Sequence, residues 1–171
     1  MMILIKVSPI ILITVLSGCQ TTSSVESSFA SNLCTVGDSS DANLTHETFN
    51  KAILDCGGYE IFTDDMLIDQ HLVFSFSNGK KMREMTLKED GSGLYIKQDK
   101  GTSEKIIWKL EDNGNLHLTY EDGYQWDWRL LSEEGNLWAV KSYGYTADGA
   151  EHDIVSMVVT NKTAMMKNVD K

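Results

Sequence analysis

Seven glycines recur at intervals of 9 to 14 residues through the second half of the chain, and they constrain its fold more than any other feature. They are Gly79, Gly91, Gly101, Gly114, Gly123, Gly135 and Gly149. Five of the seven follow Asn or Asp, and Asn-Gly and Asp-Gly pairs tolerate the positive φ of tight hairpin turns. Strands joined by such turns pair antiparallel with their neighbours. Seven turns therefore predict eight strands in sequential order.

Apolar and polar residues alternate between these turns, which is the period of a strand with one buried face. The clearest run of alternating apolar residues is Tyr124, Trp126, Trp128 and Leu130. Gln125, Asp127 and Arg129 should then point to the other side of the sheet. The stretches 72–76, 106–110 and 116–120 alternate in the same way. We expect these four strands to supply most of the core.

Two later stretches, 137–143 and 154–159, are apolar at successive positions rather than at alternate ones. Strands of this kind are buried on both faces. We expect their outer face to be covered by a helix or by the segment of chain that enters the domain.

One helix is predicted before the strands. Thr45 can cap it, Glu47 places a favourable charge in its first turn, and Gly57-Gly58 ends it. Leu44 and Phe49 stand at the two positions of a hydrophobic staple. The residues that share one face of this helix are Phe49, Ala52, Ile53 and Cys56.

Eight sequential antiparallel strands can close edge to edge, which removes both exposed edges of the sheet. The predicted fold class is mainly β: an eight-stranded up-and-down meander, as a barrel or a strongly curved sheet, with one N-terminal α-helix. The turn spacing and the run W-x-L-x-D-x-G-x-L at 108–116 resemble lipocalin-like bacterial domains over roughly 67–160. The resemblance implies a barrel interior just large enough for side chains or one small ligand. The Gly-x-Trp motif of lipocalins is missing from the sequence.

The first 18 residues have the layout of a signal peptide. Residues 1–6 carry one Lys, and 7–16 are an apolar run interrupted by Ser8, Pro9 and Thr14. This run is about half of the roughly twenty apolar residues that a membrane-spanning helix needs. We therefore expect the segment to be removed rather than retained as a transmembrane helix.

Leu16-Ser17-Gly18-Cys19 resembles the lipobox of bacterial lipoproteins. The resemblance implies cleavage before Cys19, lipidation of its sulfur, and attachment to a membrane through several acyl chains. Because Gln20 rather than Asp follows, it also implies sorting to the outer membrane, facing the periplasm, in a Gram-negative host. Residues 19–32, rich in Ser and Thr, are predicted to be a flexible tether, and 33–171 a single helix-plus-barrel domain.

Cys34 and Cys56 remain as an even pair in an exported chain, where disulfides form and persist. The alternatives are two buried free thiols or a metal site with a nearby His. The sequence has no CxxC and no Cys/His cluster, so it favours a disulfide between the two.

No residue pattern indicates catalysis, a cofactor or a metal. His46, His71, His117 and His152 lie in separate segments, and Glu151-His152-Asp153 reads as a surface cluster beside a turn. Asp64, Asp65 and Asp69 lack the spacing of a calcium loop. Nucleotide-binding and hydrolase motifs are also missing from the sequence, so we expect no enzyme, no metal and no cofactor.

Three functions remain open for this acidic domain. The first is a binding module for a small apolar ligand or a protein partner, and its candidate ligand pocket is formed by the aromatic residues Trp108, Tyr124, Trp126 and Trp128. The second is an immunity or inhibitor lipoprotein that neutralises a basic toxin or hydrolase. The third is a structural role in envelope assembly. The net charge of −10 makes nucleic acid a poor partner.

Replacing Cys19 by Ala should release the protein from the membrane fraction while leaving the domain folded, because the acyl chains are the expected anchor. Fractionation of cells followed by immunoblotting measures this. A Cys34→Ala variant keeps Cys19 and should remain membrane-bound. Continued membrane association of Cys19→Ala would contradict the anchor.

Overall fold

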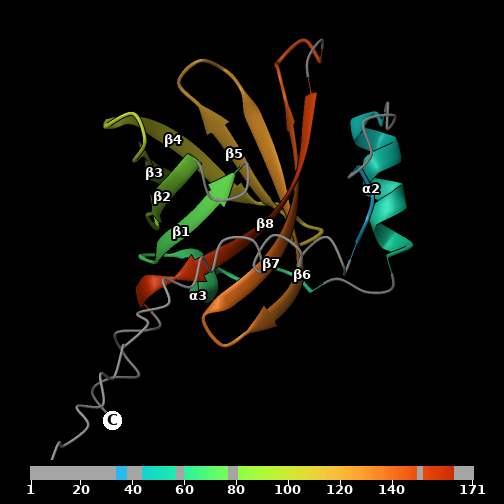
Figure 1. Ribbon diagram of the computed structural model, residues 1–171, viewed down its shortest axis with the longest axis horizontal. Coiled ribbons are helices and arrows are strands. Elements are labelled where there is room, and N and C mark those ends of the chain that lie inside the picture. Colours follow the sequence, from blue (N-terminus) through green and yellow to red (C-terminus); the bar gives the residue numbers. More distant parts are fainter. Residues whose placement is uncertain (1–33, 38–43, 57–59, 77–80, 150–151, 164–171) are drawn as a thin grey trace, which may run out of the picture.

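A computed structural model describes residues 34–37, 44–56, 60–76, 81–149 and 152–163 (Figure 1). The predicted signal peptide, Cys19, the tether, Gly57-Gly58, Gly79 and Glu151 lie outside these residues. Within them, no helix is long and apolar enough to cross a membrane.

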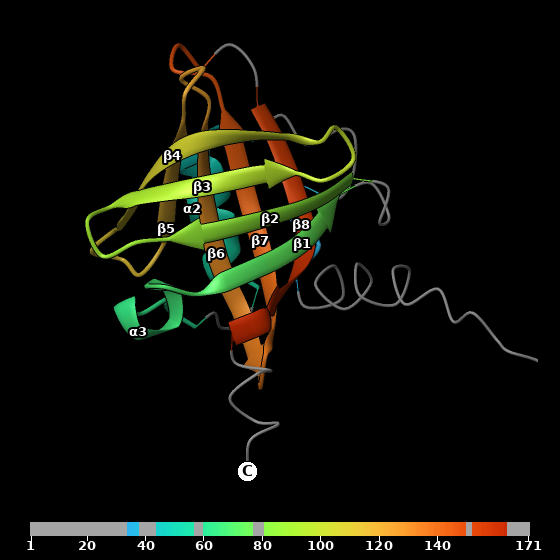
Figure 2. The same cartoon turned by 90° about the vertical axis from the view of Figure 1, so that its left-hand side faces the viewer.

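The strands form one closed antiparallel barrel in which each pairs with its neighbour in sequence and the last pairs with the first. They are β1 (His71–Phe76), β2 (Lys81–Leu87), β3 (Ser92–Lys97), β4 (Thr102–Leu110), β5 (Leu116–Tyr120), β6 (Gln125–Glu134), β7 (Leu137–Tyr145) and β8 (His152–Asn161). The predicted eight-stranded up-and-down meander is therefore confirmed, and of the two predicted forms it takes the barrel. Figure 2 shows β1 to β4 on the side of the barrel that is turned away from the helix α2 (His46–Leu54).

The turn glycines have the backbone conformation that their spacing predicts. Six of the seven are among the described residues, and their φ angles lie between 62° and 84°. An L side chain rarely adopts this region, whereas glycine enters it without steric cost. Each of these glycines lies in a turn between two consecutive strands, so they set where one strand ends and the next begins.

The inward faces of the strands meet in one hydrophobic cluster inside the barrel. Trp128 packs edge-on against Phe74, with 4.9 Å between ring centroids, and both side chains are almost fully buried. Phe62 packs against Trp138, with 5.8 Å between ring centroids, at the end of the barrel with the β4–β5 turn, where the Phe62 N–H donates to the Gly114 carbonyl at 3.0 Å. Aromatic side chains alternating along a strand therefore serve as core here.

The segment before β1 contributes to the same cluster through Phe62 and Leu67. It contains a second helix, α3 (Asp64–Leu67), which was not predicted from the sequence. Four residues are too few to show a helical period, so no pattern could reveal it. Asp64, Asp65 and Asp69 are exposed around this turn.

A buried arginine lies at the opposite end of the barrel. Arg83 is almost fully buried, and its guanidinium forms an ion pair with Asp99 and donates to the Met82 carbonyl at 2.8 Å. Tyr95 and Tyr120 pack edge to face beside it, 5.0 Å apart. Burial raises the pKa of Tyr95 to about 12, although the nearby Arg83 charge opposes the shift. A buried ion pair and two packed tyrosines therefore lie at this end of the barrel.

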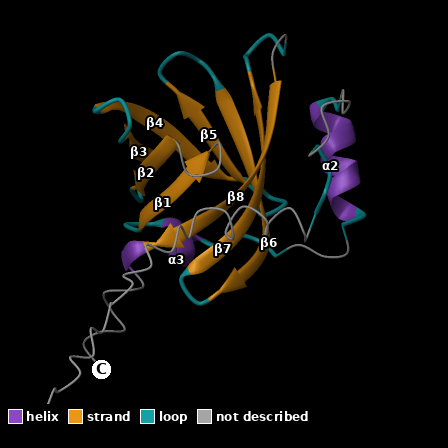
Figure 3. Ribbon diagram, in the orientation of Figure 1, coloured by secondary structure: helices purple, strands orange, loops and turns teal. Residues whose placement is uncertain are grey.

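The helix α2 lies on the outer wall of the barrel rather than inside it (Figure 3). Thr45 caps it by accepting from the Thr48 amide at 3.2 Å, as predicted. Phe49 and Ile53 point inward and form a second buried cluster with residues of β6 and β7 such as Leu131 and Tyr143. The prediction that the later strands are covered on their outer side is confirmed.

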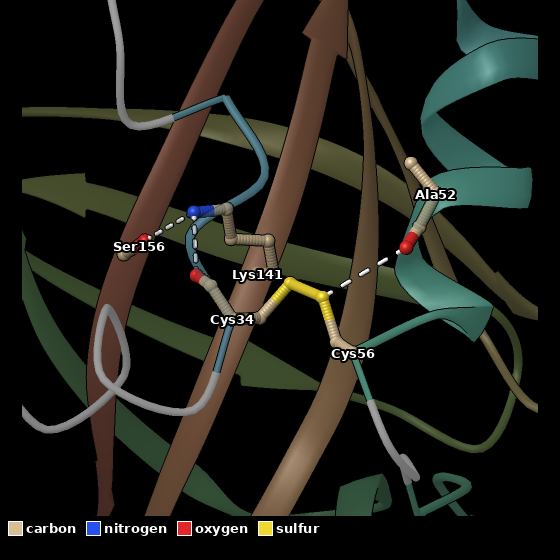
Figure 4. Close-up of a disulfide and its surroundings, with 5 residues drawn as sticks. All are labelled: Cys34, Ala52, Cys56, Lys141 and Ser156. Carbon is tan, nitrogen blue, oxygen red and sulfur yellow. Dashed lines mark hydrogen bonds between the residues drawn. A yellow bond between two sulfur atoms is a disulfide. The ribbon is translucent and has the colours of Figure 1, made fainter.

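A disulfide joins Cys34 to Cys56 at the C-terminal end of α2 (Figure 4). Beside it the fully buried Lys141 donates from Nζ to the Cys34 carbonyl at 3.1 Å and to the Ser156 hydroxyl at 2.7 Å. The disulfide links the chain that enters the domain to α2, while Lys141 ties that chain to β7 and β8.

Replacing both Cys34 and Cys56 by Ala should lower the free energy of unfolding by about 3 kcal/mol, because the bridge closes a loop of 22 residues in the unfolded chain. Guanidinium denaturation of residues 33–171, produced without the predicted lipid anchor and called the soluble domain, measures the change. Dithiothreitol should destabilise the wild-type domain to the same extent and leave the double variant unaffected. Equal stability of both proteins in the absence of reductant would contradict the bridge.

Candidate functional site

Outward-facing side chains of β4, β5 and β6 form aligned rows on the barrel wall. In one row Lys109, His117 and Asp127 are direct partners across the three strands. In the next row Ile107, Thr119 and Gln125 are partners in the same way. Direct partners on one face of an antiparallel sheet lie close enough for their side chains to interact.

Asp127 is the centre of a buried polar cluster on this wall. Its side chain is almost fully buried although it faces outward, because the N-terminal end of α2 covers it. His117 donates from Nδ1 to Asp127 Oδ1 at 2.6 Å, and His46 of α2 contacts the other carboxylate oxygen through Nε2. One carboxylate thus joins a barrel strand to the helix.

The pKa of Asp127 shows how strongly its surroundings stabilise the charged carboxylate. Burial raises this pKa, but the hydrogen bonds and the charges of His117 and His46 lower it further, and the pKa falls to about 2. A charge out of contact with water is retained only when it is paired and hydrogen-bonded. The two imidazoles meet that requirement.

Further contacts fix the groups around the carboxylate. Arg129 donates to Asn50 Oδ1 at 2.8 Å, and the His46 ring lies against Tyr145 with 5.1 Å between centroids. Burial, followed by the Asp127 charge, raises the pKa of Tyr145 to about 12. His117 Nε2 is 3.3 Å from the Thr119 hydroxyl, so the neutral ring can accept there while Nδ1 donates to Asp127.

A pocket of about 290 Å³ opens beside this cluster, and we call it the polar pocket. Every residue that lines it has a side chain that can form hydrogen bonds: His46, Asn50, Lys109, Glu111, Asn113, Asn115, His117, Gln125, Asp127 and Tyr145. Its formal charges are paired, since Lys109 contacts Glu111 at 2.8 Å and Asp127 contacts the two histidines. The polar pocket therefore suits a polar ligand without a net charge.

Asn115 stands out within the polar pocket. Only 4% of it is exposed, and its backbone N–H donates to Asn113 Oδ1 at 3.1 Å. Over the described residues, its side-chain carboxamide forms no hydrogen bond. Because the carboxamide lines the pocket and is not sealed from it, a group that enters the pocket can bond to it.

A second hollow of about 700 Å³ runs over the outer wall of β2 to β5, and we call it the apolar groove. It is lined by Thr86, Lys88, Ser92, Gly93, Leu94, Lys105, Ile106, Ile107, Thr119, Tyr120 and Glu121. Ile107 is 67% exposed and Leu94 40% exposed, which is unusual for large apolar side chains on adjacent strands. An apolar surface of this kind, bordered by polar residues, is a candidate interaction site.

The apolar groove and the polar pocket adjoin along β5. Thr119 lines the groove and His117, two residues earlier on the same face, lines the pocket. Gln125 of the pocket is the direct strand partner of Thr119. The two hollows therefore form one surface with an apolar end and a polar end.

Three of the four aromatic residues predicted to line a ligand pocket belong to the buried core or pack against it, whereas Tyr124 lies in the β5–β6 turn. Trp128 and Trp108 belong to the buried core, and Trp108 donates from its indole to the Lys88 carbonyl at 2.8 Å. Trp126 is half-buried, packs against the core and contacts Tyr124 at 5.8 Å. Both hollows described above are lined by other residues.

The sequence interpretation, which treated the four histidines as unrelated, missed the buried polar cluster around Asp127. His46 and His117 converge on Asp127, although they lie in a helix and a strand far apart in sequence. His71 instead pairs with Glu84 at 3.1 Å on the other side of the barrel. The hairpin turn at Asp122-Gly123 could have indicated that His117 and Asp127 are strand partners. No sequence pattern places His46 beside them.

Among the residues that the structure describes, no group of three His, Cys, Asp or Glu side chains is arranged to hold a metal ion. The two oxygens of Asp127 each face a different imidazole. Of the predicted surface cluster 151–153, Asp153 is exposed and accepts from the Tyr124 hydroxyl at 3.4 Å. Glu151 lies outside the description.

Comparison with protein-family models, with curated proteins and with solved structures finds no match to this chain.

Replacing Asp127 by Asn should lower the free energy of unfolding by about 2 kcal/mol at neutral pH, because the folded pKa of about 2 lies below the ordinary value of 3.8. The stabilisation from a lowered carboxyl pKa is present above the unfolded value and disappears as the pH falls through the folded one. The difference between variant and wild type should therefore shrink between pH 4 and pH 2. Urea denaturation over this range measures it.

An exposed aspartate provides the control. Asp112→Asn should change stability little at any of these pH values, because Asp112 lies on the surface of the β4–β5 turn. A loss in Asp127→Asn that persists unchanged at pH 2 would show that the carboxylate charge is not the stabilising group.

Proposed function

We propose that this protein is a lipid-anchored envelope protein that binds the apolar chain of an amphiphile on the outer wall of its barrel. The observation that carries the proposal is the apolar groove, where Leu94 and Ile107 stand exposed over adjacent strands. In this view the aromatic core is structural, and the ligand binds outside it.

The packed interior supports an external site. Residues from β1, β4, β5, β6 and β7 meet there in a single cluster, and the largest of them, Trp128 and Trp138, are fully buried. Inserting a ligand among such side chains would force them out of their packing, which costs energy rather than gaining it. The apolar groove can take a chain without that cost.

Closure of the barrel limits binding through the edges of the sheet. Each described strand is hydrogen-bonded to two neighbours, so no strand edge among them is free to pair with a partner's strand. Recognition must then use side chains on the wall or the turns. The exposed apolar side chains of the groove meet this condition, and the stems of Lys88 and Lys105 extend its apolar border.

The predicted lipid anchor on Cys19 agrees with a ligand that is found at a membrane surface. A protein held by lipid on Cys19 stays close to a membrane surface, where single-chain amphiphiles are concentrated. Binding at this site would be driven by burial of methylene groups, each worth about 0.8 kcal/mol when fully covered.

The acidic character of the chain favours a second candidate, the immunity or inhibitor lipoprotein. A formal charge of −10, or −11 after loss of residues 1–18 with their one Lys, attracts basic proteins and raises their association rate. Salt-sensitive binding to a basic toxin or hydrolase would support this candidate instead. Amphiphile binding through an apolar groove should depend little on salt.

Binding of alkyl tetraethylene glycol ethers, below their micelle concentrations, tests the amphiphile proposal. Affinity should rise by up to about fourfold for each methylene added between hexyl and decyl, because each is removed from water. Isothermal titration calorimetry of the soluble domain measures the affinities. Ile107→Asn should abolish most of this dependence.

Leu54→Asn is the matched control, since Leu54 is similarly exposed at 56% but lies at the end of α2. It should bind the whole series as the wild type does. Affinities that do not change with chain length, or equal losses in both variants, would contradict binding in the groove.

A further inference from the structure

We propose that the polar pocket holds a neutral saccharide, and that this sugar is the head group of the amphiphile whose chain occupies the apolar groove. The inference rests on the proposed function for the chain and adds the chemical class of the head. It follows from three features of the described residues: the composition of the pocket wall, its charge balance, and its position beside the groove.

The wall of the polar pocket carries the side chains that bind hydroxyl groups best. Four carboxamides line it: Asn50 already bonds to Arg129 and His46, whereas Asn113, Asn115 and Gln125 can each offer a donor and an acceptor to a ligand. A sugar hydroxyl also donates and accepts, so neighbouring hydroxyls can be matched by one amide. A ligand with only acceptors or only donors would leave half of these groups unused.

The charge balance of the polar pocket selects against ions. The Asp127 carboxylate is already engaged by two imidazoles, and Lys109 contacts Glu111 at 2.8 Å. An anion entering the pocket would meet the two carboxylates, and a cation would meet Lys109 and carboxylates that already have partners. A neutral polar ligand meets neither penalty.

The Asn115 carboxamide points independently to a ligand. It is buried to all but 4%, it lines the pocket, and over the described residues it has no hydrogen bond of its own. Buried side-chain amides are nearly always bonded to protein or ordered water. Two hydrogen bonds from a sugar, one at each end of the carboxamide, would complete it.

The geometry of the wall joins the head to the chain. Ile107 of the groove and Lys109 of the pocket project from the same face of β4, two residues apart, and Thr119 and His117 do so on β5. The pocket volume of about 290 Å³ lies at the lower limit for small-molecule sites, which suits a single sugar ring. A chain leaving that ring can run directly onto Ile107.

Octyl β-glucoside and octyl tetraethylene glycol ether share the chain and differ in the head, so they separate the two proposals. With the wild-type soluble domain, the glucoside should bind about tenfold more tightly, as expected for a few additional hydrogen bonds. Asn115→Ala should reduce this preference to about twofold or less and leave the affinity for the ether unchanged. Calorimetry below the micelle concentrations measures both ligands.

Asn136→Ala is the matched control, because Asn136 lies in the β6–β7 turn away from both hollows. It should retain the full preference. If Asn115→Ala fails to fold by circular dichroism, Gln125→Ala, which removes a half-buried amide of the same pocket, replaces it with the same expected result.

Each remaining outcome decides one of the proposals. Equal affinities of wild type for the glucoside and the ether, with Ile107 required for both, would leave the groove in place and overturn the saccharide. A preference that Asn115→Ala and Gln125→Ala both retain would also overturn it. Failure of both amphiphiles to bind would reject the proposed function, and the head group inferred from it would fall as well.

Discussion

Closure of the sheet between β1 and β8 is the constraint on which the rest of the molecule depends. Because the ladder is complete, the strands bury their inward side chains around Trp128 and leave no edge among the described strands for pairing. The polar and apolar surfaces that a ligand could meet must then lie on the outer wall of the barrel. There α2 covers the side formed by β6 and β7, and the side formed by β2 to β5 stays open to solvent.

The fold could be predicted from the sequence because its determinants are local. A turn glycine such as Gly123 requires positive φ, and alternation within a strand assigns each side chain to one face, so neither inference needs distant residues. Cys34 and Cys56 could be paired by elimination. The helix α3 escaped prediction because its four residues carry no period.

The candidate site could be predicted only in part, for a related reason. His117 and Asp127 are partners across one hairpin, a relation that the turn at Asp122-Gly123 already implies. His46 joins them through the docking of α2, which depends on the packing of Phe49 and on the disulfide rather than on any repeat. The alternation of aromatic residues led to the prediction of a ligand pocket in the barrel interior. The exposed Ile107 lies on the opposite face of β4 and gives no periodic signal.

Asp127 acts in two ways that binding measurements cannot separate. Its carboxylate holds α2 to the barrel through His46, and it also fixes the imidazole of His117 at the border of the polar pocket. A change at this residue alters stability and the pocket wall together. Asn115 and Ile107 differ from Asp127, because neither side chain forms a hydrogen bond or ion pair with another described element. Their replacement changes the surface that a ligand would meet while the closed ladder keeps the wall in place.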